Sequence, residues 1–535
     1  MLPSARTASI LCVAVLWIIA AGTTVLRAAA AAGQGTPREL AQHIFEATGV
    51  QGGLIVHLGG GDGKLIAALR ADDRFLVQGL EADASHVEAA RSYLRSLGVY
   101  GKVTVGLWTG KRLPYIDNVV NLLVSENPSG VPAEEVMRVL APGGVAYLKQ
   151  AGAWTKTVKP RTPNTDEWTH YLHDPSNNPV AHDTVIGPPR RLQWLAGPLY
   201  SRHHDRMSSV SAVVSAQGRV FTILDEGPTF SILVPPRWAL VARDAFNGKT
   251  LWRRPLESWH TTLWPLKSGP ADLPRRLVAV GDRVYAVLSA DGPLTSLDAA
   301  TGSVVRTYEG TGAVEEILSC DGVLLLLANP HAKSSEYASS KRFSRGYSDK
   351  FWDGLPRRIM AVEPETGRTL WTSERTALPV TLAADRGRVF LHDGQAVVCL
   401  DQATGQQRWR SAPVASPKVI RSFYAPNLVA SGDVVLFAAG EGLASQTGSW
   451  LRKTDDVLTA LAADTGKVLW TANDPPSGYR SPGDVLVTGG LVWTGQTHSG
   501  ESEGILTGRD PRTGEVKSEF PPDVSTYWFH HRCYR

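Results

Sequence analysis

The chain of 535 residues contains little cysteine, only four widely spaced residues with no Cys-x-x-Cys pair. This argues against a zinc ribbon, a redox pair or a disulfide framework. The chain also lacks an excess of charge of one sign, because 55 lysines and arginines stand against 51 aspartates and glutamates. Such a balance gives no support to nucleic acid as a partner. Glycine and proline are abundant, at 51 and 34 residues, which indicates many turns between short elements.

Long apolar runs are also scarce, and the one that exists lies at the start of the chain. Arg6 precedes an uncharged stretch from Ile10 to Ala21, and small residues follow from Ala28 to Gly33. This is the pattern of a secretory signal peptide, over residues 1–32. The alternative is an uncleaved anchor, since residues 8–26 are just long enough to span a bilayer. Either interpretation predicts an exported protein of the periplasm or cell envelope, with a membrane as partner only if the segment is not cleaved.

Residues 36–150 alternate between the helix and strand periods. A capping box at Thr36 predicts a first helix. The apolar stretch 54–58 predicts a strand that runs into a glycine-rich turn and a second helix, and 75–80 predicts a second strand that ends at Glu81. Strands that alternate with helices in this way indicate an open, mostly parallel α/β sheet of the Rossmann-like class.

The candidate site of this domain lies at the carboxyl ends of the strands, where ligands of open α/β sheets bind. Gly59, Gly61 and Gly63 let a ligand approach the backbone there. An acidic residue at the end of the second strand can accept hydrogen bonds from ribose hydroxyls. Glu81, 20 residues after Gly61, is placed for that role. The other interpretation is that these glycines serve only the turn.

The segments 59–63, 79–81 and 138–144 (GGGDG, GLE and RVLAPGG) resemble class I S-adenosylmethionine-dependent methyltransferases, over the span 36–150. The resemblance implies S-adenosylmethionine as cofactor, with Gly59, Gly61 and Gly63 along its methionyl end and Glu81 on its ribose. The cofactor is made in the cytoplasm, however, whereas the N-terminal signal directs the domain outward.

Three departures from the methyltransferase pattern bear on activity. His57 stands where the family has an acidic residue near the end of the first strand, and residues 106–109 (GLWT) replace a stretch that often carries one after the third strand. No further strand is expected after Leu148. No residue stands out as a methyl-transfer catalyst, although such a transfer can run on positioning alone.

Residues 151–189 show no periodicity and are rich in aromatic, histidine and asparagine residues. This composition is too aromatic for a flexible tether. We therefore expect a linker that is ordered and packs on its neighbours.

Residues 190–535 carry a repeat in which a strand precedes Asp-x-x-Thr-Gly, three further residues and a tryptophan. The glycine suits a hairpin, the aspartate can bond the turn backbone, and the tryptophan is expected to pack against the next unit. Pairs of hairpins at this spacing predict four-stranded blades of an all-β propeller with seven or eight blades, or an incomplete ring. Gln193 and Trp194 are a candidate start of a further blade. The repeat glycines are Gly248, Gly302, Gly367, Gly405, Gly466 and Gly514.

The repeat resembles the pyrroloquinoline-quinone-type repeat of eight-bladed propellers, a family of quinoprotein dehydrogenases and exported propeller lipoproteins of outer-membrane assembly. The dehydrogenases carry two adjacent cysteines over the quinone, and this chain has no adjacent cysteines. Their calcium-ligand and catalytic aspartate motifs are not recognisable either. We therefore do not expect pyrroloquinoline quinone as a cofactor, because the fold alone does not imply it.

Three histidine clusters raise the question of a metal. Adjacent histidines on a strand point to opposite faces, so each pair offers one ligand to a given site. We expect them to cap blade edges and bond loop carbonyls, with no metal. The clusters are His170/His173/Asp174, His203/His204/Asp205 and His530/His531/Cys533.

The segment 333–358 interleaves basic and aromatic residues. This favours either a surface for a glycan, an anionic polymer or a protein, or a long loop between blades.

The sequence favours two main functions, and a third function is a weaker alternative. The first is an exported two-module protein whose propeller binds a protein, small-molecule or glycan ligand, with the methyltransferase-like domain as a ligand-sensing or docking module. The second is an active methyltransferase whose propeller selects the substrate. The third is a quinoprotein oxidoreductase, which the missing cysteine pair disfavours.

Overall fold

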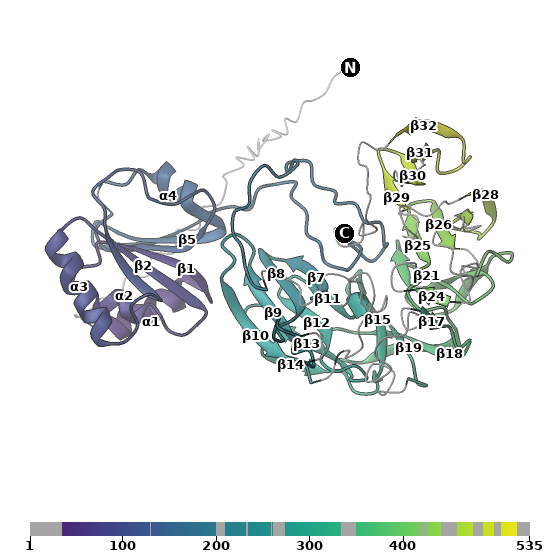
Figure 1. Cartoon of the computed structure of the whole chain (residues 1–535), viewed down its shortest axis with the longest axis horizontal. Coiled ribbons are helices and arrows are strands. Elements are labelled where there is room, and N and C mark those ends of the chain that lie inside the picture. Colours follow the sequence, from purple (N-terminus) through teal and green to yellow (C-terminus); the bar gives the residue numbers. More distant parts are fainter. Residues whose placement is uncertain are drawn as a thin grey trace, which may run out of the picture.

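The computed structural model of the chain describes residues 35–128, 130–198, 209–231, 234–257, 259, 273–332, 349–416, 419–421, 425–439, 457–473, 485–496 and 504–521 (Figure 1). The predicted signal peptide or anchor lies outside these residues, as do the two clusters built on adjacent histidine pairs and most of the segment 333–358. Within the described residues, no helix combines the length and the apolar character needed to cross a bilayer.

The N-terminal part is a layered α/β domain whose six-stranded sheet has the order β3-β2-β1-β4-β5-β6. The first five strands are parallel, as predicted. Two apolar clusters form its core, and the predicted capping box at Thr36 is present. The elements are α1 (Pro37–Thr48), β1 (Gly53–Leu58), α2 (Lys64–Ala68), β2 (Phe75–Glu81), α3 (Ala84–Ser96), β3 (Val103–Leu107), β4 (Val120–Ser125), α4 (Ala133–Val139), β5 (Leu140–Gln150) and β6 (Ala153–Val158).

The sheet continues past residue 150, where the linker was expected to begin. β6 pairs antiparallel with β5 through the turn Ala151-Gly152, so the expectation that no strand follows Leu148 is wrong. Both turn residues have positive φ, 48° and 83°, which suits a two-residue hairpin. The signal was weak because Ala-Gly is not a usual hairpin pair and β6 has no fully buried residue.

The C-terminal part contains six four-stranded antiparallel sheets among its described residues, one for each turn signature (Figure 1). They follow one another along the chain as the blades of a propeller. The sequence predicts seven or eight blades or an incomplete ring, with a further blade that would begin near Gln193 and Trp194. In the described part of the chain, the residues around Gln193 and Trp194 form no sheet of their own.

Each blade is built from strands that are close together in the chain. Blade 1 comprises β7 (Val210–Ala216), β8 (Arg219–Asp225), β9 (Trp238–Asp244) and β10 (Thr250–Pro255); blade 2, β11 (Leu277–Val280), β12 (Arg283–Val287), β13 (Leu294–Asp298) and β14 (Val304–Thr307); blade 3, β15 (Val314–Cys320), β16 (Val323–Ala328), β18 (Pro356–Val362) and β19 (Thr369–Thr376). Blade 4 comprises β20 (Ala383–Asp385), β21 (Arg388–His392), β22 (Val397–Asp401) and β23 (Gln407–Arg410); blade 5, β25 (Asn427–Ser431), β26 (Val434–Ala439), β27 (Val457–Ala462) and β28 (Val468–Asn473); blade 6, β29 (Leu486–Thr488), β30 (Leu491–Gln496), β31 (Ile505–Arg509) and β32 (Val516–Phe520). A short pair, β17 (Asp349–Phe351) with β24 (Val419–Arg421), and the 3-10 turn Leu273–Arg276 complete this part.

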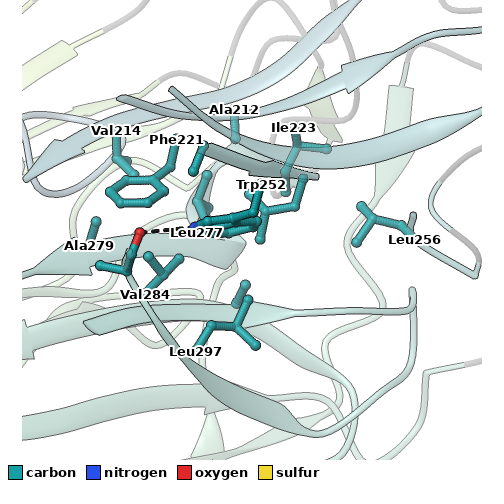
Figure 2. Packing of buried hydrophobic residues seen from close by; sticks show 14 of the residues in the cluster. Ala212, Val214, Phe221, Ile223, Trp252, Leu256, Leu277, Ala279, Val284 and Leu297 are labelled. Carbon is teal, nitrogen blue, oxygen red and sulfur yellow. Dashed lines mark hydrogen bonds between the residues drawn. The ribbon is translucent and has the colours of Figure 1, made fainter. Parts of the chain in front are cut away.

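A tryptophan docks one blade on the next, as the repeat predicted. Trp252 of blade 1 donates its indole N–H to the carbonyl of Ala299 in blade 2 at 2.9 Å, within a buried apolar cluster (Figure 2). Its ring lies so close to Gly302 that a Cβ there would be 2.5 Å from Cδ2 of the indole. The repeat glycine is thus required by its positive φ and by the ring above it. The equivalent pairs are Trp371 with Gly405, Trp409 with Gly466, and Trp470 with Gly514.

Two other aromatic residues act at the remaining joints. Tyr308 stands between blades 2 and 3 and donates its hydroxyl to the carbonyl of Pro364 at 2.7 Å. Trp194 donates its indole N–H to Ala245 O of blade 1 at 2.9 Å, and its ring covers Gly248. Trp194 therefore holds blade 1 in the way that the other tryptophans hold the blades after it.

Residues 168–178, which we call the belt segment, bond to the first strand of all six blades. The blades are met in chain order, and first strands of neighbouring blades also contact one another, from β7 through β25. The segment therefore ties the blades together along their inner side. The bonded pairs are Trp168–Ser215, Thr169–Ala279, His170–Ser319, Pro175–Ala384, Ser176–Ala430 and Asn178–Val487.

The two parts meet at the amino ends of β1 and β4. Asn247, which replaces threonine in the blade 1 repeat, donates its amide to Val119 O at 2.9 Å and to Asn121 Oδ1 at 2.8 Å. Asn121 in turn donates to Asp244 Oδ2 at 2.6 Å and accepts from the backbone N–H of Leu54 at 2.8 Å. A threonine could not make both amide bonds, so the exception to the repeat serves the joint between domains.

We expect Gly405→Ala to destabilise the propeller more than Gly281→Ala. Both glycines have positive φ, 71° and 56°, so each substitution carries the left-handed cost of about 1–2 kcal/mol. Only at Gly405 would the new Cβ meet an indole, at 2.6 Å, which adds about 1–3 kcal/mol of overpacking. Urea unfolding followed by tryptophan fluorescence measures the difference, and equal losses would contradict the docking role of the ring.

We expect Asn247→Thr to uncouple the two domains, because threonine keeps the turn and loses both amide donors. A double-mutant cycle with Asn121→Ala should give a coupling free energy of about 1–3 kcal/mol. Urea unfolding followed at 222 nm reports the helices of the α/β domain. Thr404→Asn makes the reverse exchange at the equivalent position of blade 4, and should be close to neutral there. A coupling energy of zero would show that these contacts do not hold the domains together.

Candidate functional site

The glycine turn joins β1 to α2 at the carboxyl edge of the sheet. Gly59, Gly61 and Gly63 all have positive φ, 80°, 50° and 84°, so the turn itself requires glycine. A Cβ on Gly59 or Gly61 would find nothing within 4 Å, whereas one on Gly63 would lie 3.0 Å from Ala90 Cβ. The first two glycines therefore also leave open space beside the backbone, and the third packs against α3.

Glu81 is the last residue of β2, as the sequence predicted, and its side chain reaches across to this turn. Its Oε2 accepts the backbone N–H of Gly61 at 2.8 Å, and Oε1 accepts that of Ala82 at 2.8 Å. His86 Nδ1 lies 4.0 Å from Oε1, and the Glu81 carboxylate remains partly accessible. Oε1 also accepts the backbone N–H of Asp83 at 3.4 Å. The second lone pair of Oε2 can accept a ligand hydroxyl, so Glu81 can both hold the loop and bind a ligand.

His57 occupies the strand position next to this edge and is buried, at 2% exposed. Neither ring nitrogen has a hydrogen-bond partner. Burial lowers the pKa of His57 to about 4, against a smaller opposing effect of the Glu81 charge. The imidazole is therefore neutral at pH 7, where the methyltransferase pattern places a negative charge.

The end of β3 also lacks a carboxylate. Trp108 follows this strand, donates its indole N–H to Arg112 O at 2.9 Å and its backbone N–H to Glu81 O at 2.8 Å. The loop after β3 is thus held by backbone contacts, with an indole where an acidic side chain often lies. Ser125, which ends β4, is buried and donates its hydroxyl to Leu58 O at 3.2 Å.

These residues fit one half of S-adenosylmethionine. The open space at Gly59 and Gly61 and the carboxylate of Glu81 suit a ribose, whose hydroxyls need acceptors. The charged amino-acid end needs an acceptor with negative charge, and the unpaired, neutral His57 does not supply it. Among the described residues, Glu81 therefore provides acceptors for a ribose, whereas His57 provides no charged partner for the amino-acid end.

The domain joint lies at the opposite end of β1 from this site. Leu54 and Asn121 mark the joint, whereas Gly59 follows the last residue of the same strand. A strand of six residues is about 17–20 Å long. Among the described residues, the propeller therefore contacts the edge that faces away from the glycine turn.

His170, one of two buried histidines in the belt segment, bonds within the protein, but it accepts a backbone N–H where a bond to a loop carbonyl was expected. His170 Nε2 accepts the backbone N–H of Ser319 at 3.0 Å, and Nδ1 lies 2.7 Å from the Thr169 hydroxyl. Burial lowers its pKa to about 3. Both ring nitrogens are engaged, so His170 is a structural residue of the belt.

Several positioning residues could not be found from the sequence. In the sequence, Asn247 is only a minor deviation from the repeat. Asn177 is one of several polar residues in a stretch without periodicity. The Asn177 amide donates to Leu382 O at 2.8 Å and Leu428 O at 3.1 Å. Glu316, buried with a pKa raised to about 7 by desolvation, pairs with Arg275 at 3.3 Å. The only signal for Glu316 was a polar residue within a strand pattern.

The α/β domain matches methyltransferase structures. A candidate S-adenosyl-L-methionine-dependent methyltransferase from Methanococcus maripaludis is 23% identical over 21% of this chain and 54% of its own length, with a TM-score of 0.20. Geranyl diphosphate C-methyltransferase from Streptomyces coelicolor A3(2) is 17% identical over 21% of this chain and 44% of its own, with a TM-score of 0.20. The chain thus spans about half the length of these two proteins.

The propeller matches a different group of proteins. BamB from Moraxella catarrhalis is 17% identical over 60% of this chain and 83% of its own length, with a TM-score of 0.36. No curated protein matches the chain. A family model described as the outer membrane protein assembly factor BamB matches residues 156–329 and 357–521, which is more than half of the chain. The chain belongs to this family of propeller proteins, with a methyltransferase-like domain in front of the repeats.

Proposed function

We propose that this chain is an exported, non-catalytic binding protein of the cell envelope. Its propeller binds a protein, small-molecule or glycan ligand, and its methyltransferase-like domain acts as a ligand-sensing or docking module, with a nucleoside as the ligand that it senses. Membership of the BamB family supports the envelope location and the binding role. The N-terminal signal pattern supports export.

One observation carries the non-catalytic part of the proposal. His57 is neutral and unpaired at the position where the methyltransferase pattern needs a negative charge. The glycine turn and Glu81, in contrast, keep an intact hydrogen-bonded cradle for a ribose. A site that retains the ribose cradle but lacks the negative charge for the amino-acid end of the cofactor favours recognition of a nucleoside over transfer of a methyl group.

The position of the domain joint supports the same conclusion. A propeller that selected a methyl acceptor would have to border the carboxyl edge of the sheet, where the cofactor reacts. Blade 1 instead contacts the amino ends of β1 and β4 through Asn247. The joint is therefore suited to fixing the α/β domain on blade 1, or to passing a conformational change of the α/β domain to the propeller.

An active methyltransferase is the second candidate, and the contact between Glu81 and Gly61 favours it. That contact reproduces the acid-to-turn spacing of the family. Under this alternative, S-adenosylmethionine would bind far more tightly than a nucleoside, because its amino-acid end would add charged contacts. The two candidates therefore differ in a simple comparison of ligands.

Isothermal titration should give dissociation constants of adenosine and S-adenosylmethionine for the full chain that agree within about fivefold, because the amino-acid end has no charged partner. A tenfold difference would require about 1.4 kcal/mol of additional binding free energy. Glu81→Ala should abolish binding of both. Glu88→Ala is the matched control, because Glu88 is exposed and pairs only with Arg91. Binding of S-adenosylmethionine a hundredfold tighter than adenosine would favour the enzyme, and no binding of adenosine would contradict the sensing role.

The pH dependence of stability tests the state of His57. Its pKa is lowered from 6.5 to about 4 on folding, so the unfolded chain takes up the proton first. Stability is therefore lost as the pH falls from 6.5 towards 4, by about 2 kcal/mol between pH 7 and pH 5 for this residue alone.

We expect His57→Gln to remove this part of the acid lability. Urea unfolding followed at 222 nm at pH 7 and pH 5 should show a smaller loss in the variant than in the wild type. His392, whose pKa is also lowered to about 4 by burial, lies in the propeller, and His392→Gln is the matched control that should leave the transition of the α/β domain unchanged. Identical losses for wild type and His57→Gln would mean that His57 is not held neutral.

A further inference from the structure

We propose that His173 and Asp174 of the belt segment, together with His182, form a binding site for a divalent transition-metal ion. Each residue offers one ligand atom, and these atoms all lie within 4.8 Å of one another. Two imidazoles and a carboxylate are ligands that zinc and its neighbours accept. This site is independent of the proposed function, because it lies outside the methyltransferase-like domain.

The surroundings of Nδ1 of His173 suit a metal ligand. The side chain is 3% exposed, and Nδ1 makes no hydrogen bond although Asp174 Oδ2 lies 3.2 Å away. Two ligand atoms that each lie about 2.0–2.2 Å from one zinc ion are separated by about 3.3–3.6 Å at tetrahedral angles, close to the 3.2 Å between this nitrogen and this oxygen. The nitrogen and the oxygen are therefore spaced as two ligands of one ion, without the alignment of a hydrogen bond.

A second carboxylate lies on the other side of the His173 ring. Asp166 Oδ2 lies 2.8 Å from His173 Nε2. A hydrogen bond here places the proton on Nε2 and leaves the lone pair of Nδ1 facing Asp174 and His182. Metal-binding histidines almost always donate their second nitrogen to such a carboxylate. Asp166 is therefore the residue that orients the ligand.

Asp166 also positions the third ligand. The same Oδ2 atom accepts the backbone N–H of His182 at 2.6 Å. The ring of His182 stands edge-on to that of His173, with 5.1 Å between the ring centroids. One carboxylate thus holds both histidines, which come from residues nine positions apart in the chain.

The site is accessible and is separate from the structural histidine of the belt. His182 is exposed, and 26% of the Asp174 side chain is accessible, so an ion can enter and water can complete its coordination. From the sequence, His170 was grouped with His173 and Asp174. The structure removes His170 from the group, because Ser319 and Thr169 occupy its nitrogens, and adds His182.

A bound ion would cross-link the belt segment at His173 and Asp174 to His182, which lies beyond the end of the belt. The loop 171–174 lies between the belt contacts to blade 3 and those to blade 4. The ion would therefore fix the belt where it leaves one blade for the next, and its removal should loosen the belt without unfolding the blades.

The test uses the full chain after treatment with a chelator, with Zn²⁺ and Co²⁺ as probes. We expect Co²⁺ to give visible absorption bands of a protein-bound ion that Zn²⁺ displaces. His182→Ala, at an exposed position that can be changed without unfolding, should weaken Zn²⁺ binding at this site at least a hundredfold. Asp166→Asn should weaken it about 10–100-fold, as expected for an orienting carboxylate.

His331→Ala is the matched control, since His331 is also exposed and is not a member of the cluster. This variant should bind Zn²⁺ as the wild type does. Circular dichroism checks that each variant is folded. No Co²⁺ bands in the wild type, or Co²⁺ bands of equal strength in His182→Ala, would overturn the proposal and leave His173 as an ion pair between Asp166 and Asp174.

Discussion

The close approach of an indole ring to a glycine is the contact on which the C-terminal architecture depends. Each blade is a twisted sheet with two apolar faces, and it is stable only when a neighbour covers them. Trp252, for example, covers Gly302 and bonds to the carbonyl of Ala299 in the next blade. The glycine has no side chain to hold the ring away, so burial, the hydrogen bond and the turn conformation all require the same pair of residues.

Two further sets of contacts hold the blades together and connect them to the α/β domain. The belt segment bonds to the first strand of each of the six described blades, in chain order. The joint at Asn247 then docks blade 1 on the amino ends of β1 and β4. Neither of these contacts, among the described residues, involves the carboxyl edge of the α/β sheet, where Glu81 bonds to the glycine turn and His57 is neutral.

The sequence predicted the parts that depend on local pattern. The tryptophan of the repeat, the glycines of the turn and the place of Glu81 at the end of β2 each follow from residue type and spacing, and the structure places them as expected. The sequence could not predict contacts between residues far apart in the chain. Asn247 looks like a variant threonine, and the unpaired state of His57 depends on what surrounds the strand.

Other features lay between these extremes. The strand β6 was missed because its hairpin uses Ala151 in a conformation that glycine or asparagine usually adopts. The histidine cluster was recognised as a candidate, but its membership was not, because which nitrogen is free depends on Ser319 and Asp166. Residue types alone indicated that these side chains could bind a metal, but only the fold shows which of them lie together.

Recognition of a nucleoside by an α/β domain that lacks the charged end of a methyltransferase site is the central claim. A crystal structure of the full chain with bound S-adenosylhomocysteine tests it most directly. We expect ribose hydroxyls on the Glu81 carboxylate and an amino-acid end with no contact to His57. A ligand whose ammonium group is held at His57, beside a methyl acceptor pocket closed by the propeller, would contradict it.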